Sequence, residues 1–354
     1  MDIKTLIRKE VFEQKGYRTD ITTCTIKMDA MENPFTLSPF LKDKLLGEFK
    51  KVPLNRYPEP GALTIRKRFA EHYGVGEDTI MIGNGSDELI QLLCTALADS
   101  ALVVMVPAPT FVMYRIIALN TGRTVIEVPL DAAFDLDLDA MCRCLTTKTP
   151  ALVFISSPNN PTGNCFSEKK IETIIENSTG IVVIDEAYSS FSGKTLLPLL
   201  KKYENLAILK TLSKVGLAAM RIGFLIGAPP LVRELDKVRL PYNINALSQV
   251  AAGFYIDHID MFVSQTKEVI ERRETLFKAL SKIKGIHPYS SEANFIFFSC
   301  DFDTDHVYRA LIHEGILIKN LNGPGILKNC MRVTIGNREE NEQFLKAFKK
   351  VIQK

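Results

Sequence analysis

The sequence of 354 residues contains no tryptophan and only five histidines. No apolar run approaches the roughly 20 residues that a membrane-spanning helix needs, and residues 1–10 are charged and lack the apolar core of a signal peptide. The seven cysteines show no CxxC spacing and do not cluster with histidines. A disulfide framework and a zinc site are therefore not expected. We predict a cytoplasmic protein that binds neither a membrane nor a metal ion.

The charge of the sequence is nearly balanced. The net charge is +3, with lysines and arginines dispersed along the chain, so no nucleic-acid surface is expected. The apolar fraction of 46% and the charged fraction of 24% are typical of an ordinary globular protein. Chains of this length usually fold as two domains.

Seven apolar runs alternate with helical patterns such as residues 86–98 and 167–177. Near-continuous apolar runs predict an α/β fold in which helices cover both faces of a largely parallel, seven-stranded sheet. The runs lie at residues 80–82, 101–106, 124–128, 151–155, 181–184, 206–209 and 222–226. We predict a large domain at residues 46–245, preceded by an N-terminal arm or small-domain segment at 1–45. A long helical pattern at 245–284 leads into a small α+β domain at 246–354.

The segment between the last two runs carries a lysine, Lys214, flanked by probable buried strands. Desolvation pushes such an amine toward its neutral form, which attacks carbonyl groups. The nearby Thr211, Ser213 and Arg221 form a plausible set for binding a phosphate. A cofactor with both an aldehyde and a phosphate, pyridoxal phosphate, would satisfy both features. The alternative is an ordinary strand-end lysine in solvent.

Other strand ends also carry polar groups, and ligands collect at this edge of a doubly wound sheet. Residues 83–88 open a helix, and Gly85 and Ser86 could form an anion cradle there; the alternatives are plain N-capping by Ser86 or a dinucleotide site. Asp185 follows four apolar residues and needs a cationic or N–H partner, unless it only caps a helix. It could hold a pyridine nitrogen protonated, which makes the ring an electron sink. Residues 156–163 include two asparagines with amide donors.

These motifs resemble the fold type I pyridoxal-phosphate-dependent aminotransferases, and among them the histidinol-phosphate aminotransferases. The resemblance extends from residues 29–34 to residues 332–336. Its most specific parts are Asn-Arg-Tyr-Pro at 55–58, Ser-Pro-Asn-Asn-Pro-Thr-Gly at 157–163, Asp-Glu-Ala-Tyr at 185–188, Thr-Leu-Ser-Lys at 211–214 and Pro-Tyr-Asn-Ile-Asn at 241–245.

The resemblance implies roles for individual cofactor-binding residues. Lys214 would bind the cofactor aldehyde and act as the acid–base group, and Asp185 would contact the ring nitrogen. Asn160 and Tyr188 would hold the phenolic oxygen. Phe111 would stack on the ring, where tyrosine is common. The phosphate would be held by Ser86, Asp87, Ser213, Arg221 and Thr211, although the spacing from Lys214 to Arg221 is one residue shorter than in better-known members. Tyr57 would reach the active site of a neighbouring subunit, which implies a homodimer.

The resemblance also implies the reaction. Arg332 would bind the anionic end of the substrate, and Lys319 stands where many relatives carry a second arginine. The expected reaction is transfer of the amino group of L-histidinol phosphate to the 2-oxo acid 2-oxoglutarate, giving imidazole acetol phosphate and glutamate in histidine biosynthesis. The alternatives are an aromatic or general α-amino-acid aminotransferase, a decarboxylase of a phosphorylated amino acid, and a pyridoxal-phosphate-binding regulator. Tyr17 is either a substrate contact or a residue that packs the arm on the core.

Overall fold

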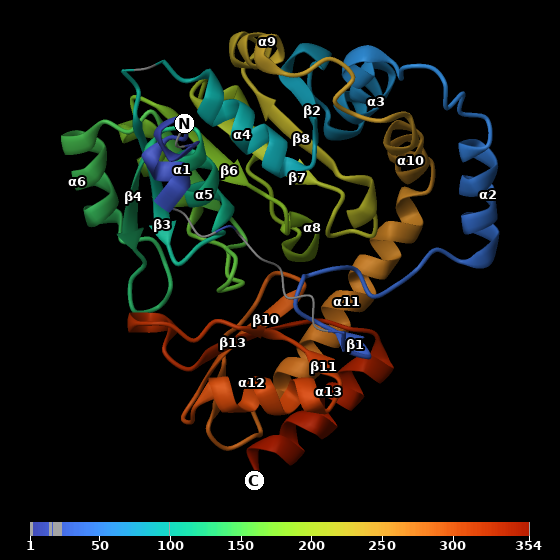
Figure 1. Cartoon of the computed structure of the whole chain (residues 1–354), viewed down its shortest axis with the longest axis vertical. Coiled ribbons are helices and arrows are strands. Elements are labelled where there is room, and N and C mark those ends of the chain that lie inside the picture. The colour runs from blue at the N-terminus through green and yellow to red at the C-terminus, as the bar shows by residue number, and fades with distance from the viewer. Residues whose placement is uncertain (1–2, 14–15, 17–22, 99, 354) are drawn as a thin grey trace.

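The computed structural model describes residues 3–13, 16, 23–98 and 100–353, so Tyr17 lies outside the described residues. The chain forms a large domain around a seven-stranded sheet and a small C-terminal domain around a four-stranded sheet. In Figure 1 the long helix α11 (Ile259–Leu280) runs from the large domain toward the small one.

All seven predicted apolar runs form strands of the large sheet, in the order β2-β8-β7-β6-β5-β3-β4. Four ladders are parallel, and β8 is antiparallel to both of its neighbours, β2 and β7. The sheet is therefore largely parallel, as predicted. The strands are β2 (Ile80–Asn84), β3 (Val103–Ala108), β4 (Thr124–Pro129), β5 (Leu152–Ser156), β6 (Ile181–Asp185), β7 (Leu206–Thr211) and β8 (Ile222–Gly227).

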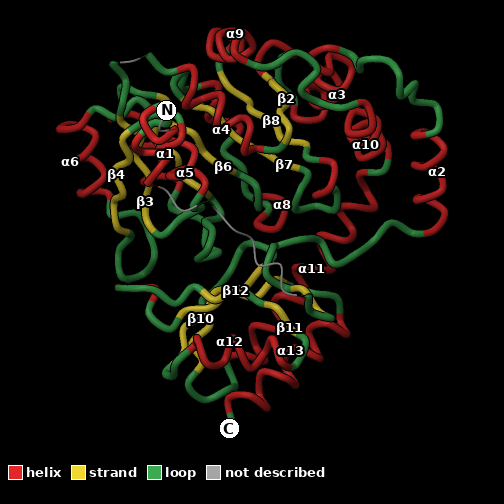
Figure 2. Tube along the Cα trace, viewed as in Figure 1, coloured by secondary structure: helices red, strands yellow, loops and turns green. Residues whose placement is uncertain are grey.

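Helices cover both faces of this sheet, as Figure 2 shows in red around the yellow strands. Helices α4 (Ser86–Ala96), α5 (Met113–Asn120) and α9 (Pro229–Val238) pack on one face, and α6 (Leu138–Lys148) and α7 (Glu168–Asn177) on the other. Alternate strand residues enter different cores: Phe154 belongs to the first and Ile155 to the second. Because successive strand side chains point to opposite faces, both must be apolar, which produces the continuous runs.

The helical pattern at residues 245–284 is two helices and not one. Asn245 is the N-cap residue of helix α10 (Ala246–Asp257), and its side chain accepts a hydrogen bond from the Ser248 N–H. Helix α11 follows α10 after one residue. His258 separates them with a non-helical backbone (φ −127°, ψ 27°). The sequence has neither glycine nor proline at this point, so the usual signal for a helix break is missing.

The small domain packs an antiparallel sheet, in the order β12-β13-β10-β9, against the C-terminal half of α11 and two further helices. Its elements are β9 (Ile286–Pro288), β10 (Phe295–Cys300), α12 (Thr304–His313), β11 (Ile316–Leu317), β12 (Lys319–Asn320), β13 (Cys330–Thr334) and α13 (Arg338–Ile352). The N-terminal segment joins this domain through β1 (Ile26–Lys27), which pairs in parallel with β11. The two segments lie side by side at the bottom of Figure 1.

The N-terminal arm contacts both domains. Helix α1 (Lys9–Glu13) packs on α5 of the large domain, whereas β1 belongs to a sheet of the small domain. Helix α2 (Pro39–Phe49) packs on α10, which also contacts α3 (Leu63–Tyr73). The predicted boundary at residue 45 falls within α2. The boundaries at 45 and 245 stay predictions.

No helix in the described part of the chain is long and apolar enough to cross a membrane. Nor do the described residues include a group of three or more histidine, cysteine, aspartate and glutamate side chains placed to hold a metal ion. Six cysteines are free thiols: Cys94, Cys142, Cys144, Cys165, Cys300 and Cys330.

Candidate active site

A cavity lies at the carboxyl ends of the central strands and gathers side chains that are far apart in the sequence. Ten of the residues predicted from sequence line it, together with Ser156 and Ala187, which were not predicted. The lining residues are Ser86, Asp87, Phe111, Ser156, Asn160, Asp185, Ala187, Tyr188, Thr211, Ser213, Lys214 and Arg221. The parallel strands place these residues together because their carboxyl ends share one edge of the sheet.

Lys214 lies just after β7, in the turn that leads to β8. Its Nζ is 3.4 Å from the carbonyl oxygen of Ala30 and 5.8 Å from the centre of the Tyr188 ring. Burial, with a smaller contribution from the guanidinium of Arg332, lowers the pKa of Lys214 to about 8. The amine therefore has an appreciable neutral fraction near neutral pH, which a nucleophile or proton acceptor requires.

Asp185 ends β6 and is only 3% exposed. Its Oδ2 accepts a hydrogen bond of 2.7 Å from the Tyr114 hydroxyl, and its Oδ1 accepts one of 2.9 Å from the Ala187 N–H. Burial raises the pKa of Asp185 to about 6, against the opposing effect of these hydrogen bonds. The carboxyl group is thus mainly ionised at neutral pH. It can hold a positively charged N–H of a ligand.

Sequence reasoning did not predict Tyr114. It lies in α5 and is fully buried. A tyrosine buried in an apolar helix usually needs a hydrogen-bond partner for its hydroxyl. The sequence could therefore have indicated that Tyr114 makes a buried polar contact. The sequence did not indicate which group would be the partner.

Asn160, Tyr188 and Arg332 form a buried polar chain. The Asn160 Nδ2 donates to the Tyr188 hydroxyl at 3.2 Å, and the Arg332 Nη1 donates to the Asn160 Oδ1. Arg332 also donates from Nη2 to the Asp29 carbonyl oxygen at 2.8 Å, and its guanidinium lies 5.2 Å from the centre of the Phe295 ring. Burial raises the pKa of Tyr188, so its hydroxyl remains protonated. The chain joins β13 of the small domain to the loop after β5.

The start of α4 makes a cradle of main-chain N–H groups. Gly85, and not Ser86, is the N-cap residue, with no side-chain capping bond, and Ser86 is the first residue of the helix. The alternative interpretation, N-capping by Ser86, is therefore wrong. Gly85 has a φ of +80°, and a Cβ atom there would lie 2.6 Å from the Arg221 Nη2. A Cβ at Gly223 would lie 2.5 Å from the Ser86 nitrogen. Only glycine leaves room for this close approach of backbone and guanidinium.

Side chains complete the cradle. Arg221 contacts Asp87 (Nη2–Oδ2, 3.0 Å) and Ser213 (Nη1–Oγ, 3.4 Å), and the Thr211 hydroxyl donates to the Ser213 hydroxyl at 3.0 Å. Arg221 reaches this position with a φ of +53°, so the short spacing from Lys214 does not remove it from the cavity. A helix N-terminus, two hydroxyls and a guanidinium together suit a phosphate group.

The whole cavity fits pyridoxal phosphate. The phosphate cradle lies at one end, and the buried carboxylate of Asp185 suits the ring nitrogen. Asn160 and Tyr188 offer polar groups for a ring oxygen, while Phe111 and Ala187 provide apolar walls. Lys214 supplies the amine that an aldehyde requires.

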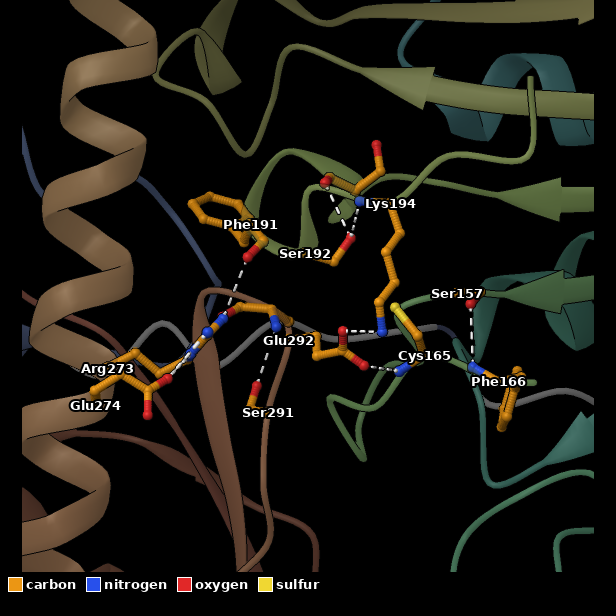
Figure 3. A network of polar contacts seen from close by, with 12 residues as sticks. Ser157, Cys165, Phe166, Phe191, Ser192, Lys194, Arg273, Glu274, Ser291 and Glu292 are labelled. Carbon is orange, nitrogen blue, oxygen red and sulfur yellow. Dashed lines mark hydrogen bonds and ion pairs between the residues drawn. The ribbon is translucent and has the colours of Figure 1, made fainter. Parts of the chain in front are cut away.

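A polar network holds the loop that carries Asn160 to the small domain (Figure 3). The Glu292 N–H donates to the Gly163 carbonyl oxygen at 2.6 Å. The Glu292 carboxylate accepts from the Cys165 N–H at 3.2 Å and pairs with the Lys194 Nζ at 2.5 Å. We call these three contacts of Glu292 the Glu292 bridge. It ties the C-terminal side of the Asn160 loop, at Gly163 and Cys165, to the segment that precedes β10.

Four of the predicted site residues, Tyr57, Arg332, Lys319 and Gly85, do not line the cavity. Tyr57 is 80% exposed, and its ring stacks on Tyr242 with centroids 4.4 Å apart. Arg332 reaches the site through Asn160, as described above. Lys319 lies directly opposite Arg332 in the β12–β13 ladder. The phosphate-cradle residue Gly85 acts through its backbone next to the cavity.

Comparison with known proteins adds independent information. The family of class I and II aminotransferases matches residues 25–348. The chain is 45% identical to histidinol-phosphate aminotransferase 2 of Nitrosococcus oceani over 346 residues, covering 97% of this chain and 96% of the relative. It is 38% identical to the histidinol-phosphate aminotransferase of Aquifex aeolicus, covering 98% of each. In fold it resembles the histidinol-phosphate aminotransferase of Sinorhizobium meliloti in complex with pyridoxal-5'-phosphate (TM-score 0.86, 21% identity, 94% of this chain and 92% of that one).

Proposed function

This chain belongs to the class I and II aminotransferase family, and we propose that it transfers the amino group of L-histidinol phosphate to 2-oxoglutarate with pyridoxal phosphate as cofactor. The products are imidazole acetol phosphate and glutamate, in a step of histidine biosynthesis. Full-length similarity to relatives named histidinol-phosphate aminotransferase supports this proposal. So does the cavity that fits the cofactor.

The observation that favours a phosphorylated donor is the pairing of Lys319 with Arg332. These residues lie opposite each other on adjacent antiparallel strands, so their side chains share one face of the sheet, with Cβ atoms about 5 Å apart. Arg332 contacts Asn160 at the cavity. Two neighbouring cations suit a phosphate dianion better than a single carboxylate.

Pyridoxal phosphate, when bound, supplies an aldehyde for amine exchange and a ring that withdraws electrons from the α-carbon of the substrate. Lys214 is the group that moves the α-proton. With a pKa of about 8, about a tenth of the free amines are neutral at pH 7, compared with well under a thousandth for an ordinary lysine. Lys214 can therefore accept a proton and return it at the same working pH.

The remaining residues hold the reacting parts in place. Asp185 keeps a proton on the ring nitrogen because its carboxylate is ionised at neutral pH and has no salt bridge to another residue among those described. Tyr188 and Asn160 orient the ring oxygen, and Arg332 binds the anionic end of the donor. Since Arg332 and Asn160 contact each other, donor and cofactor are held in one frame.

We also propose a homodimer in which Tyr57 completes the site of the neighbouring subunit. The exposed apolar side chains of Leu54, Tyr57, Leu240 and Tyr242 support this, because such side chains are typical of protein interfaces. The stacking of Tyr57 on Tyr242 joins the segment that carries Leu54 to the segment that carries Leu240. Subunit mixing tests the proposal: Lys214→Ala and Tyr57→Ala proteins, each inactive alone, should regain activity at about a quarter of the sites after refolding together. No recovery contradicts a shared site.

We propose the cytoplasm as the compartment. Cys94, Cys142, Cys144, Cys165, Cys300 and Cys330 are free thiols, which is typical of proteins in a reducing environment.

A comparison of amine donors tests the proposed substrate. The value of kcat/KM should be highest for L-histidinol phosphate, and lower for phenylalanine and for threonine phosphate. A preference for phenylalanine would favour an aromatic aminotransferase. Release of carbon dioxide from threonine phosphate would favour a decarboxylase. A protein that binds the cofactor but reacts with no amine would be a regulator.

A further inference from the structure

The hydroxyl of Tyr114 lies behind the carboxylate that faces the cofactor cavity. It donates to the Asp185 Oδ2 at 2.7 Å, and Tyr114 is fully buried. The Tyr114 ring stacks on Phe154, with centroids 4.9 Å apart and an interplanar angle of 2°. Packing on β5 therefore fixes the position of the hydroxyl.

The same ring also supports the apolar wall of the cavity. Phe111 meets Tyr114 edge to face, with ring centroids 5.4 Å apart at 84°. Phe111 lies just before α5 and Tyr114 is in its first turn, so the two side chains are neighbours on one turn of chain. Tyr114 thus contacts both a group suited to the ring nitrogen and a group suited to the ring face.

We propose that Tyr114 is a positioning residue, which acts through Asp185 and Phe111 to set the ring-nitrogen contact and the stacking face of the cofactor together. This inference rests on the proposed function, because it takes pyridoxal phosphate as the ligand. Tyr114 itself does not line the cavity.

Its two contributions are separable. The hydroxyl stabilises the ionised form of a carboxylate that burial would otherwise protonate. Tyr114→Phe removes only that hydrogen bond and keeps the ring against Phe111 and Phe154. Loss of the hydroxyl should raise the pKa of Asp185 further, since one oxygen loses its donor. The contact with a protonated ring nitrogen should weaken.

The test is cofactor binding to the Tyr114→Phe protein, measured by titrating the cofactor-free enzyme at several pH values. Two ligands are compared: pyridoxal phosphate, and its 1-deaza analogue, in which carbon replaces the ring nitrogen. We expect about tenfold weaker binding of pyridoxal phosphate, and the decline in its affinity at low pH should begin at a higher pH. Binding of the analogue should change little. The analogue therefore separates the ring-nitrogen contact from general damage to the site.

Tyr203→Phe is the matched control, because the Tyr203 hydroxyl also lies within hydrogen-bond distance of carboxylates, those of Glu176 (2.6 Å) and Glu172 (3.0 Å), away from the cavity. It should bind both ligands as the unmodified protein does. Unchanged affinity and pH dependence in Tyr114→Phe, or an equal loss for both ligands, would overturn the proposal. If the unmodified protein did not bind pyridoxal phosphate at all, the proposed function would be wrong. That result, which differs from the two above, would overturn this inference as well.

Discussion

The guanidinium of Arg332, on β13 of the small domain, donates a hydrogen bond to the amide oxygen of Asn160, on the loop after β5 of the large domain. The contact crosses from one domain to the other at the edge of the active-site cavity, which Asn160 lines. The group suited to the anionic end of the donor is thereby tied to a group suited to the ring of the cofactor. A change that loosens the contact between the domains should therefore raise the KM for the donor before it affects kcat.

The Glu292 bridge provides a test of this coupling. Glu292→Gln removes the ion pair with Lys194 and leaves the fold intact. Because both side chains are partly exposed (31% and 65%), unfolding should become easier by only about 0–1 kcal/mol. Steady-state kinetics should show a raised KM for the donor, by about threefold, with a smaller change in kcat.

The matched control for that variant is Glu314→Gln. It removes the Lys350–Glu314 pair, which has similar exposure (55% and 29%) and a distance of 2.8 Å, but lies in the small domain away from the cavity. The control should lose similar stability and keep its KM. Equal KM values in the two variants would mean that the bridge does not position the Asn160 loop.

Lys319 should determine preference for a phosphorylated donor. Lys319→Gln removes one of two adjacent cations, so kcat/KM for L-histidinol phosphate should fall by about tenfold, while a donor without phosphate should be affected little. Lys319→Arg should restore activity, since a guanidinium binds phosphate through two parallel hydrogen bonds. An equal loss for both kinds of donor would place Lys319 outside phosphate recognition.

Replacement of Lys214 should abolish turnover. Lys214→Ala removes both the amine for the aldehyde and the proton acceptor, and a loss on the order of 10³-fold or more is expected in single-turnover measurements. Lys214→Arg is the charge-preserving control and should be equally inactive, because a guanidinium stays protonated. Substantial transamination by either variant would contradict the role of Lys214.

The pKa of Asp185 predicts a pH dependence of cofactor binding. Burial raises this pKa from 3.8 to about 6, so the carboxylate is ionised above pH 6 and becomes neutral as the pH falls through that value. Binding of a protonated ring nitrogen needs the ionised form. Affinity for the cofactor should therefore be highest well above pH 6 and decline as the pH falls through about 6.

Asp185→Asn isolates that effect, since the phosphate of the cofactor also titrates in this range. The variant should bind the cofactor more weakly at neutral pH. The variant should still lose some affinity at low pH, but only the loss that is caused by protonation of the cofactor phosphate. An identical pH profile for the variant and the unmodified protein would show that Asp185 is not the titrating group.

The sequence predicted the large sheet well because burial on both faces leaves a strong pattern of continuous apolar runs. It also predicted most of the cavity. The position of residues after those runs indicated Lys214, Asp185 and the phosphate cradle, because these residues meet at one edge of the sheet, whereas the family resemblance indicated Asp87, Phe111 and Tyr188. The roles assigned to them stay predictions until tested.

The features that sequence missed depend on contacts between distant segments. Glu292 meets Cys165 across 127 positions, and nothing local marks either residue. The break at His258 has no glycine or proline. Tyr114 needed a hydroxyl partner, but only the packing of α5 on β5 and β6 identifies that partner as Asp185. Ser86 looked like a capping residue, whereas the backbone places Gly85 at that position.

The most direct test of the account is to treat the enzyme, loaded with pyridoxal phosphate, with borohydride and to map the labelled peptide by mass spectrometry. The cofactor should be found on the peptide that contains Lys214, and on the Nζ of that residue alone. A label on the neighbouring Lys210, on any other lysine, or on none would contradict the central claim.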